Sequence, residues 1–370
     1  MKNKLILIQS TDCSIEDYIR EGLFSRHKIL IDEYKQHFEV EYYTSDIHNY
    51  SKVLGVIHHP IILGIKKFGL RHILYYITLI LKAQKMNGVI RVFNSTVPVL
   101  PIIKRLSKQP VILSFQYNWA EVTRANYKGI KKWAARFTQM QAMKAADIVL
   151  CTTDKLKEKT ENDYKKKNTV IIPNYVDQNH FNMQHEKENI IFYAGRLFWA
   201  KGVNFLIKAF IKLKENNLFN YKLLIAGDGE ERDNLIKLAG KYCNKDIVFL
   251  GNIDYFEVAE YMSKAKIYVQ PTVNMEGHPR ALIEAMSSAC ACIATNVNGN
   301  KDIIRNLENG ILVNPKNEEE LYYSIKKLIG NVELCSYLAG NAYKDSKQYS
   351  ISSVMEKEIG LLKHISNNKK

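Results

Sequence analysis

Short apolar runs alternate with helical stretches along most of the chain. In the first half, the runs that predict strands are Leu5–Ile8, His37–Tyr43, Gly88–Phe93, Val111–Phe115, Ile148–Cys151 and Thr169–Ile172. Helical patterns lie between most of them, which is typical of βαβ units in a parallel sheet.

The segment IIPNYVDQNHFNMQHEKEN, residues 171–189, breaks this periodicity with proline, asparagine and charge, as a linker does. The alternation then restarts, with strands predicted at Ile190–Tyr193, Tyr221–Ala226, Ile247–Leu250, Ile267–Gln270, Ala291–Thr295 and Ile311–Val313. Helices are predicted at about 202–217, 230–243, 255–264, 279–289, 300–308 and 317–330.

The two arrays predict an α/β protein of two Rossmann-like, doubly wound domains that face each other across a cleft. A chain of 370 residues can bury two such cores. The expected parts are a first domain at 1–172, a linker at 173–188, a second domain at 189–345 and a C-terminal helix at 346–370 that crosses back to the first domain. Because open α/β sheets bind ligands beyond the carboxyl ends of strands, functional residues are expected at strand-to-helix turns.

Charge is distributed unevenly. The net charge of +15 divides into +12 for residues 1–185 and +3 for the rest, and no acid occurs between Asp46 and Glu121. One-sided charge favours an anionic partner, although a solvated basic face explains it equally well.

One basic stripe lies in the segment 60–85. On a helix, Lys67, Arg71, Lys82 and Lys85 fall within an arc of about 60°, with hydrophobic residues around most of the remainder. This pattern predicts either a helix in a membrane interface, with its cations toward anionic headgroups, or a buried helix with one solvent-exposed stripe. Gly69 would break the helix in two.

Several classes of protein are not indicated. The N-terminal apolar run is too short for a signal peptide, and no run reaches the roughly 18 apolar residues of a membrane span. The six cysteines form no C-x-x-C pair, and no nucleic-acid-binding motif occurs. His48, His58 and His59 are interpreted as ordinary surface or loop histidines.

Two glycine-rich turns follow predicted strands of the second half. In GRLFWAKG, Arg196 offers a fixed fork for phosphate oxygens and Lys201 a mobile point charge, unless both are incidental surface cations. In GDGEERDNL, Gly227 and Gly229 permit close backbone approach to a ligand, although a plain tight turn explains them too.

The stretch MEGHPRALIEAMSSA begins a third candidate helix. Pro279 suits the first turn of a helix, whose exposed N–H groups at 277–281 would bind an anion. Arg280 opposes the helix dipole there, as expected if an anion occupies the site, unless its side chain points to solvent. Glu276 and Glu284 are placed around a ligand rather than as an acid/base pair. Together the three turns predict a site for a nucleoside diphosphate attached to a hydroxyl-rich group.

These motifs resemble a known family. AGRLFWAKG, IAGDGEERDNL, FLGNIDYFEVAEYMSKAKIYVQPTVNMEGHPRALIEAMSSACACIATNVNGNKDII and NGILVNPKNEEELYYSIKKLI are similar, in order, to the donor half of retaining glycosyltransferases of family 4, which have the GT-B fold. IIPNYVD resembles the family's hinge segment, with Tyr175 where glycine is usual. The resemblance covers about residues 145–335.

The resemblance implies roles for the matched positions. Arg196 and Lys201 would hold the donor diphosphate and stabilise it as leaving group, while Glu276 would contact the transferred sugar and Glu284 the ribose. The implied catalytic residues are Glu276, Arg196 and Lys201. The implied donor-binding residues are Gly195, Arg196, Lys201, Gly227, Asp228, Gly229, Asn252, Ile253, Glu276, Gly277, His278, Pro279, Arg280, Ala281 and Glu284. No metal or other cofactor would be required, since the cations and the helix terminus stabilise the charge.

The first half departs from the family pattern. Ser10-Thr11-Asp12-Cys13-Ser14 stands where many relatives carry a Gly-Gly loop, and Gln116-Tyr117-Asn118 where many carry a histidine. Asp12 and Gln116 are the acceptor-side candidates.

The expected function is retaining transfer of a hexose from a nucleoside diphosphate sugar, UDP-linked for example, to a hydroxyl of a glycan or lipid-linked glycan, in polysaccharide, lipopolysaccharide or glycolipid synthesis. The expected location is cytoplasmic, peripheral on the inner face of the membrane, with Lys67, Arg71, Lys82 and Lys85 contacting anionic lipid and with no nucleic-acid partner. The alternatives are a nucleotide-sugar epimerase or hydrolase of related fold, and a non-catalytic basic binding protein.

Overall fold

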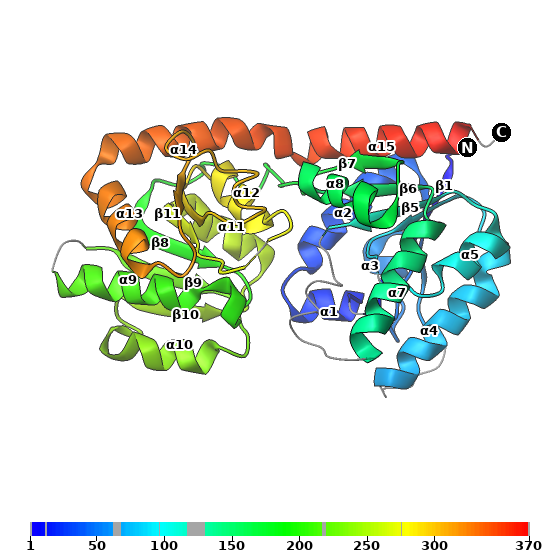
Figure 1. Cartoon of the computed structure of the whole chain (residues 1–370), viewed down its shortest axis with the longest axis horizontal. Coiled ribbons are helices and arrows are strands. Elements are labelled where there is room, and N and C mark those ends of the chain that lie inside the picture. The colour runs from blue at the N-terminus through cyan, green and yellow to red at the C-terminus, as the bar shows by residue number, and fades with distance from the viewer. Residues whose placement is uncertain are drawn as a thin grey trace. The chain divides into compact units, whose positions relative to one another are not determined.

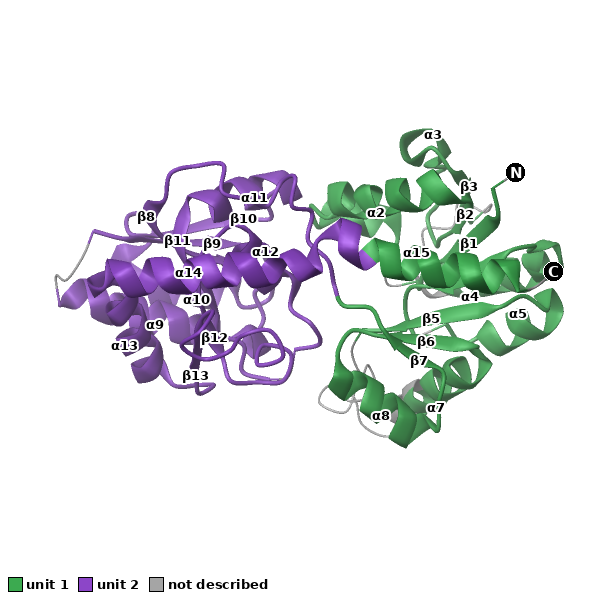
Figure 2. Ribbon diagram, turned by 90° about the horizontal axis from the view of Figure 1, so that it is seen from above, with its two compact units in different colours: residues 1–173, 355–370 green, residues 174–354 purple. Residues whose placement is uncertain are grey.

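The computed structural model describes residues 2–11, 13–61, 68–95, 97–116, 130–216, 220–274 and 276–368. The chain divides into two compact units (Figure 2): unit 1 is Met1–Pro173 with Met355–Lys370, and unit 2 is Asn174–Val354. Each unit is built on one parallel sheet, with seven strands in unit 1 and six in unit 2. The prediction of two doubly wound α/β domains is confirmed.

Unit 1 has the strand order β3-β2-β1-β4-β5-β6-β7. Its strands are β1 (Lys4–Ile8), β2 (Glu39–Tyr43), β3 (Ile57–His59), β4 (Val89–Val92), β5 (Val111–Phe115), β6 (Ile148–Cys151) and β7 (Thr169–Ile171). Its helices are α1 (Ile15–Arg20), α2 (Phe24–His37), α3 (Ser51–Leu54), α4 (Phe68–Lys82), the 3₁₀ turn η1 (Ala83–Lys85), α5 (Leu100–Ser107), α7 (Ile130–Ala145) and α8 (Asp154–Tyr164).

Unit 2 has the strand order β10-β9-β8-β11-β12-β13. Figure 1 labels the first four of these strands. Its strands are β8 (Glu188–Ala194), β9 (Lys222–Ala226), β10 (Ile247–Gly251), β11 (Ala265–Gln270), β12 (Ala291–Thr295) and β13 (Ile311–Val313). Its helical elements are η2 (Trp199–Lys201), α9 (Val203–Glu215), α10 (Arg232–Ala239), η3 (Gly240–Tyr242), α11 (Tyr255–Lys264), α12 (Arg280–Ser287), α13 (Glu318–Gly330), α14 (Val332–Ser346) and η4 (Lys347–Tyr349).

Two sequence-based predictions of elements are wrong. The helix predicted at 300–308 is a series of turns, because asparagine side chains bond to the backbone in its place: Asn300 donates to the Thr295 carbonyl and Asn309 to that of Ile303. Sequence reasoning also missed β3, a three-residue strand too short for a periodic signal. The segment 60–85 is helical from Phe68 to Lys82 without a break at Gly69, and residues 62–67 lie outside the described part.

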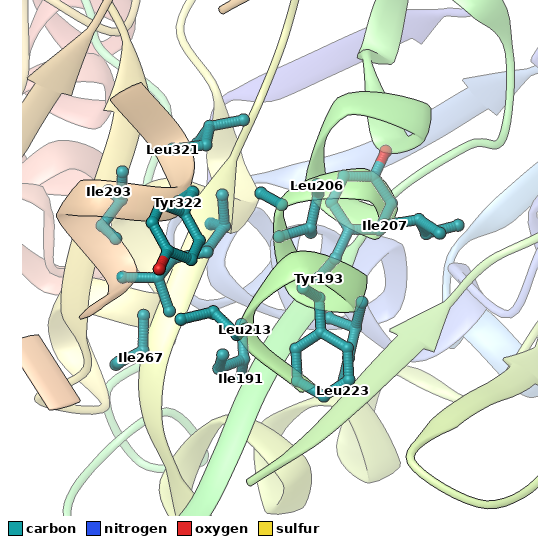
Figure 3. Packing of buried hydrophobic residues seen from close by; sticks show 14 of the residues in the cluster. Ile191, Tyr193, Leu206, Ile207, Leu213, Leu223, Ile267, Ile293, Leu321 and Tyr322 are labelled. Carbon is teal, nitrogen blue, oxygen red and sulfur yellow. The ribbon is translucent and has the colours of Figure 1, made fainter. Parts of the chain in front are cut away.

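The core of unit 2 forms where α9 and α13 pack on the sheet. Leu206, Ile207 and Leu213 of α9 meet the strand residues Ile191 and Leu223 there (Figure 3). Because this packing fixes the strands from one side, the loops at their carboxyl ends are held at defined positions.

The last helix, α15 (Ile351–Asn367), continues from unit 2 into unit 1. Its Glu358, buried at 4% exposure, accepts hydrogen bonds of 2.6 Å from Arg91 Nε of β4 and from the Tyr34 hydroxyl of α2. Burial opposes the charge of the Arg91 guanidinium, but the Glu358 carboxylate outweighs it and raises the Arg91 pKa. This buried ion pair fastens α15 to the sheet of unit 1.

Two cations of α4 face the protein itself. Arg71 Nε donates to the Ser45 carbonyl at 2.5 Å and Nη2 lies 3.3 Å from Glu16, while Lys82 Nζ lies 3.2 Å from His59 Nδ1. Arg71 and Lys82 therefore do not form the outward basic stripe that the sequence predicted, because α1, β3 and the loop after β2 offer them polar partners. Lys67 lies outside the described residues, and Lys85 is exposed.

In the described part of the chain, no helix is both long and apolar enough to cross a membrane.

Candidate functional site

The candidate site lies at the point of unit 2 where the strand order reverses. The chain leaves β8 toward β9 on one side, and β11 pairs with β8 on the other. In doubly wound sheets this switch point is where ligands bind, because the loops after the two central strands diverge there. Lys201 follows β8 and Glu276 follows β11, so the switch point brings together two residues that lie 75 positions apart.

Gly202 fixes the turn that carries Lys201. Its φ is +67°, and a Cβ there would lie 2.1 Å from the carbonyl oxygen of Pro271, just after β11. The Val273 N–H also donates to the Ala200 carbonyl at 2.9 Å. Only glycine allows this approach, so the loops after β8 and β11 are held together by their backbones.

Glu276 is the centre of a polar network. Its Oε1 accepts from Lys201 Nζ at 2.5 Å, from Thr272 Oγ1 at 2.8 Å and from Gln270 Nε2 at 3.1 Å. The Lys201 and Glu276 side chains are 19% and 14% exposed, so the ion pair is largely shielded from water. Burial raises the pKa of the Tyr193 hydroxyl, and the nearby charge of Glu276 raises it further.

A further layer orients this network. Thr295 Oγ1 donates to the Thr272 carbonyl at 2.6 Å and itself accepts from Asn300 Nδ2 at 3.1 Å. The Glu276 N–H donates to the Asn298 carbonyl, and a Cβ on Gly299 would lie 2.7 Å from the Glu276 carbonyl oxygen. The sequence analysis assigned no role to these residues. A signal that could have indicated them is that the apolar strands of this unit end in polar residues.

Arg196 and Lys201 share one aromatic neighbour. The Arg196 guanidinium carbon lies 5.2 Å from the centre of the Phe198 ring, and Lys201 Nζ lies 5.7 Å from it. Cations within about 6 Å of a ring face are attracted to it. Phe198 therefore gathers the two predicted diphosphate ligands, of which Arg196 is exposed and Lys201 half-buried.

The Gly227-Asp228-Gly229 turn packs against the turn after β8. A Cβ on Gly227 would lie 2.0 Å from the Gly195 carbonyl oxygen, and one on Gly229 would lie 2.2 Å from that of Leu197. These glycines therefore let two loops meet, a role that differs from both the ligand contact and the plain tight turn considered from the sequence. The exposed Asp228 carboxylate accepts from the Gly229 N–H at 2.7 Å.

The third motif begins α12. Pro279 is the N-cap and Arg280 the first helical residue, and no side chain caps this end. Arg280 is half-buried and Glu284 is 5% exposed within the helix. Glu284 is also one cause, after burial, of the raised pKa of Tyr268, so its carboxylate lies close to the end of β11.

His278 faces the start of unit 2. Its Nδ1 accepts from the Asn174 N–H at 3.3 Å, its carbonyl accepts from Asn174 Nδ2 at 2.6 Å, and its ring meets the Tyr349 ring edge-on. Burial, with the charge of Arg280, lowers the His278 pKa to about 4. The imidazole is therefore neutral at pH 7 and anchors the loop between Glu276 and α12.

The remaining candidates of unit 2 lie at the same edge of the sheet. Asn252 and Ile253 follow β10, exposed and half-buried respectively, and half-buried Gly277 and Ala281 flank the start of α12.

Unit 1 carries a smaller polar cluster at its own switch point, between β1 and β4. Asn94 Nδ2 donates to Ser10 Oγ at 2.7 Å and lies 3.7 Å from Cys13 Sγ. Of the acceptor-side candidates, Asp12 lies outside the described residues. Gln116 is half-buried after β5, and its carbonyl accepts from Thr152. Asn94 was missed from the sequence.

The histidine prediction is wrong for His58. It is 3% exposed on β3, its Nε2 lies 2.7 Å from Thr44 Oγ1, and burial lowers its pKa to about 4. His48 is exposed and His59 half-buried. Within the described ranges, no group of three His, Cys, Asp or Glu residues is placed to hold a metal ion.

Solved structures identify the fold. The chain is similar over 98% of its length to Anabaena Alr3699/HepE in complex with UDP and glucose, with a TM-score of 0.76, 15% identity and 100% of that chain covered. It is also similar over 98% of its length to sucrose-phosphate synthase from Thermosynechococcus elongatus, with a TM-score of 0.75, 16% identity and 99% of that chain covered. The fold is therefore GT-B, as expected.

A sequence comparison points in the same direction for unit 2. The model for "Glycosyl transferases group 1" matches residues 175–345, which is a little less than half of the chain. The second unit is therefore similar to the group 1 glycosyltransferases.

Two relatives show how far the similarity extends. An uncharacterized glycosyltransferase of Methanocaldococcus jannaschii is 30% identical over 180 residues, which are 48% of this chain and only 45% of that relative. A Campylobacter jejuni enzyme is 28% identical over 315 residues, 84% of this chain and 82% of its own length. That enzyme is the GalNAc-α-(1→4)-GalNAc-α-(1→3)-diNAcBac-PP-undecaprenol α-1,4-N-acetyl-D-galactosaminyltransferase.

Proposed function

We propose that the protein transfers a hexose from a nucleoside diphosphate sugar to a hydroxyl of a glycan acceptor, with retention of configuration. The observation that carries the proposal is the Lys201–Glu276 pair at the switch point of unit 2, with Arg196 on the same aromatic ring as Lys201. Cations for a diphosphate and a carboxylate for sugar hydroxyls are thus adjacent on one sheet edge.

Each group has a distinct task in this proposal. Arg196 and Lys201 bind the diphosphate and stabilise the charge that grows on it as the sugar departs. All hydrogen bonds to the Glu276 carboxylate within the described residues end on Oε1, which leaves Oε2 to accept from a sugar hydroxyl. Glu284 is assigned to the ribose, as its place on α12 next to this loop allows.

Donor and acceptor classes are proposed with support from the relatives. The Anabaena protein of the same fold binds UDP and glucose, which favours a UDP-sugar donor. The Campylobacter enzyme acts on an undecaprenol-linked glycan, and a Staphylococcus aureus relative serves capsular polysaccharide synthesis. For this chain we therefore propose a lipid-linked acceptor in surface polysaccharide or lipopolysaccharide synthesis. The enzyme would reach that acceptor from the cytoplasmic face of a membrane. Ser10, Cys13 and Asn94 join Gln116 as candidates on the acceptor side.

We also propose that no metal ion takes part, because cations of the chain stand where the diphosphate charge develops. Activity that survives a chelator and is not raised by added magnesium would support this.

Ligand-observed NMR with UDP-, GDP- and ADP-sugars tests the donor site. Wild type should bind one nucleotide class, and Arg196→Ala and Lys201→Ala should each weaken it, whereas Lys241→Ala on exposed η3 should not. If none of the three classes binds, or the variants bind equally, the assignment fails. Turnover of the donor without any acceptor would favour the epimerase or hydrolase alternative, and an α-linked product from an α-linked donor would establish retention.

A further inference from the structure

The exposed side of α4 is apolar rather than basic. Tyr75 and Leu79 of α4 are buried at 1% and 0% exposure and join the core of unit 1. On the opposite side of the helix, four large aliphatic side chains face solvent: Leu70 at 43% exposure, Ile73 at 57%, Ile77 at 45% and Leu81 at 74%. At 100° per residue these four fall within an arc of about 80°, so they form one continuous stripe along the helix.

The stripe extends onto two neighbouring helices. Helix α5 contacts both α4 and α7, and all three contribute to one core cluster of unit 1 (Figure 1). Ile102 of α5 is 45% exposed, and Trp133 and Phe137 of α7 are 67% and 43% exposed. The two aromatic rings stack at 5.3 Å with an interplanar angle of 12°. A soluble surface seldom gathers this many large apolar groups without a partner.

The charge on the same helices has one sign. Neither α4, α5 nor α7 contains an aspartate or glutamate. The exposed cations of η1, α5 and its C-cap, and α7 are Lys85, Arg105, Lys108, Arg136 and Lys144. Arg71 and Lys82 therefore face the protein, whereas Lys85 and four cations outside the predicted stripe lie on the exposed side of these elements.

We propose that this layer, the apolar residues of α4, α5 and α7 with the cations around them, binds the surface of an anionic lipid bilayer. Aliphatic side chains would enter the acyl boundary, Trp133 would lie at the headgroup level, and the cations would meet anionic headgroups. A protein partner would be expected to face at least some acids on this layer, whereas an anionic bilayer matches a surface with cations alone. The layer is separate from the donor site and does not depend on the proposed function.

Vesicle flotation of the full chain tests the proposal. Wild type should float with phosphatidylglycerol-containing vesicles and much less with pure phosphatidylcholine. The triple variant Ile73→Ser, Ile77→Ser, Leu81→Ser should bind at least about tenfold more weakly, since each buried aliphatic side chain supports partitioning. Val332→Ser with Tyr337→Ser, exposed apolar residues of α14, is the matched control and should float as wild type does.

Two further measurements separate the sources of binding. Lys85→Gln with Arg105→Gln and Lys108→Gln should lose at least about tenfold on anionic vesicles, whereas Lys241→Gln, Lys245→Gln and Lys327→Gln in unit 2 should not. In a Trp119→Phe, Trp199→Phe background, brominated lipid should quench Trp133, then the only tryptophan of the chain.

Flotation that the aliphatic variant does not reduce would overturn the proposal, and so would an unquenched Trp133. If wild type instead forms a dimer that the aliphatic variant dissociates, with no vesicle binding, the layer is a self-association surface and the proposal is wrong. Donor binding by NMR should be unchanged in every variant of this layer, so failure of the membrane proposal and failure of the glycosyltransferase proposal give different results.

Discussion

Replacing Glu276 by glutamine should have opposite effects on two ligands. Lys201 Nζ lies 2.5 Å from Glu276 Oε1, so the cation assigned to the diphosphate is paired with a carboxylate. Glutamine keeps a similar shape and can still accept from Thr272, but it removes the negative charge. A bare nucleoside diphosphate should therefore bind Glu276→Gln more tightly than wild type. Sugar transfer should slow, because a carboxylate is a stronger acceptor for sugar hydroxyls than an amide.

The sizes follow from Coulomb's law. Two like charges about 7 Å apart repel by roughly 2 kcal/mol at an effective dielectric constant near 20, and salt screening about halves this. Removing the Glu276 charge should thus tighten nucleoside diphosphate binding by about fivefold. Lys201→Met removes an attraction of about 4 kcal/mol at 4 Å, but it also removes the ion pair that binding has to disrupt. A net weakening of about 10- to 100-fold is expected.

Titration calorimetry with UDP at two salt concentrations is the assay. The double variant should bind UDP more tightly than Lys201→Met, because the repulsion between the Glu276 carboxylate and the diphosphate is lost whether or not Lys201 is present. Glu319→Gln, an exposed carboxylate of α13 paired with Lys212, should leave the affinity unchanged. If Glu276→Gln binds UDP no tighter than wild type, the carboxylate does not lie near the diphosphate, and if Lys201→Met binds UDP as wild type does, Lys201 is not the diphosphate ligand.

Three further predictions concern stability. Gly202→Ala should destabilise the protein by at least about 2 kcal/mol more than Gly251→Ala in denaturant titrations. Both glycines have a positive φ, but only a Cβ on Gly202 would clash with a neighbouring backbone, so equal losses of stability would contradict the prediction. Glu358→Ala should cost about 3–5 kcal/mol, because it leaves Arg91 charged and buried, and an unchanged melting temperature would show that the pair contributes nothing. His278 should make the protein less stable as pH falls from 6.5 toward 4, where only the unfolded chain binds its proton. The loss of stability from pH 7 to pH 5 should be smaller by about 2 kcal/mol in His278→Gln than in wild type, with His58 still contributing in both, and an equal loss would contradict this.

The sequence predicted the fold well because its signal is local. Strands such as Val111–Phe115 and Ala291–Thr295 are buried on both faces, so they appear as unbroken apolar runs whose bounds can be taken directly from the letters. The errors fall where side chains compete with the backbone or where an element is short. The asparagines around 300–309 turned an expected helix into loops, and β3 has three residues.

The candidate site was predictable in its residue types but not in its pairing. Glycines, cations and glutamates at strand ends indicated a phosphate and hydroxyl site. The sequence could not show that Gly227 and Gly229 accommodate a neighbouring backbone, or that Gln270 and Thr272 support Glu276, because those contacts depend on how the strands are ordered. The sheet order places β8 beside β11 and so joins loops that lie far apart in the chain.

The orientation of helix α4 could not be predicted from the sequence for the same reason. Periodicity correctly placed Arg71 and Lys82 on one side of the helix, but a helical wheel does not say which side faces the protein. Arg71 turned inward because Glu16 and the Ser45 carbonyl lie within reach, and their presence depends on how α1 and the loop after β2 pack. With the polar side taken by the unit's own groups, the apolar side is left to solvent. An exposed apolar stripe beside cations is therefore a consequence of the packing, and the proposed partner, an anionic bilayer, would supply both acyl chains and negative charge.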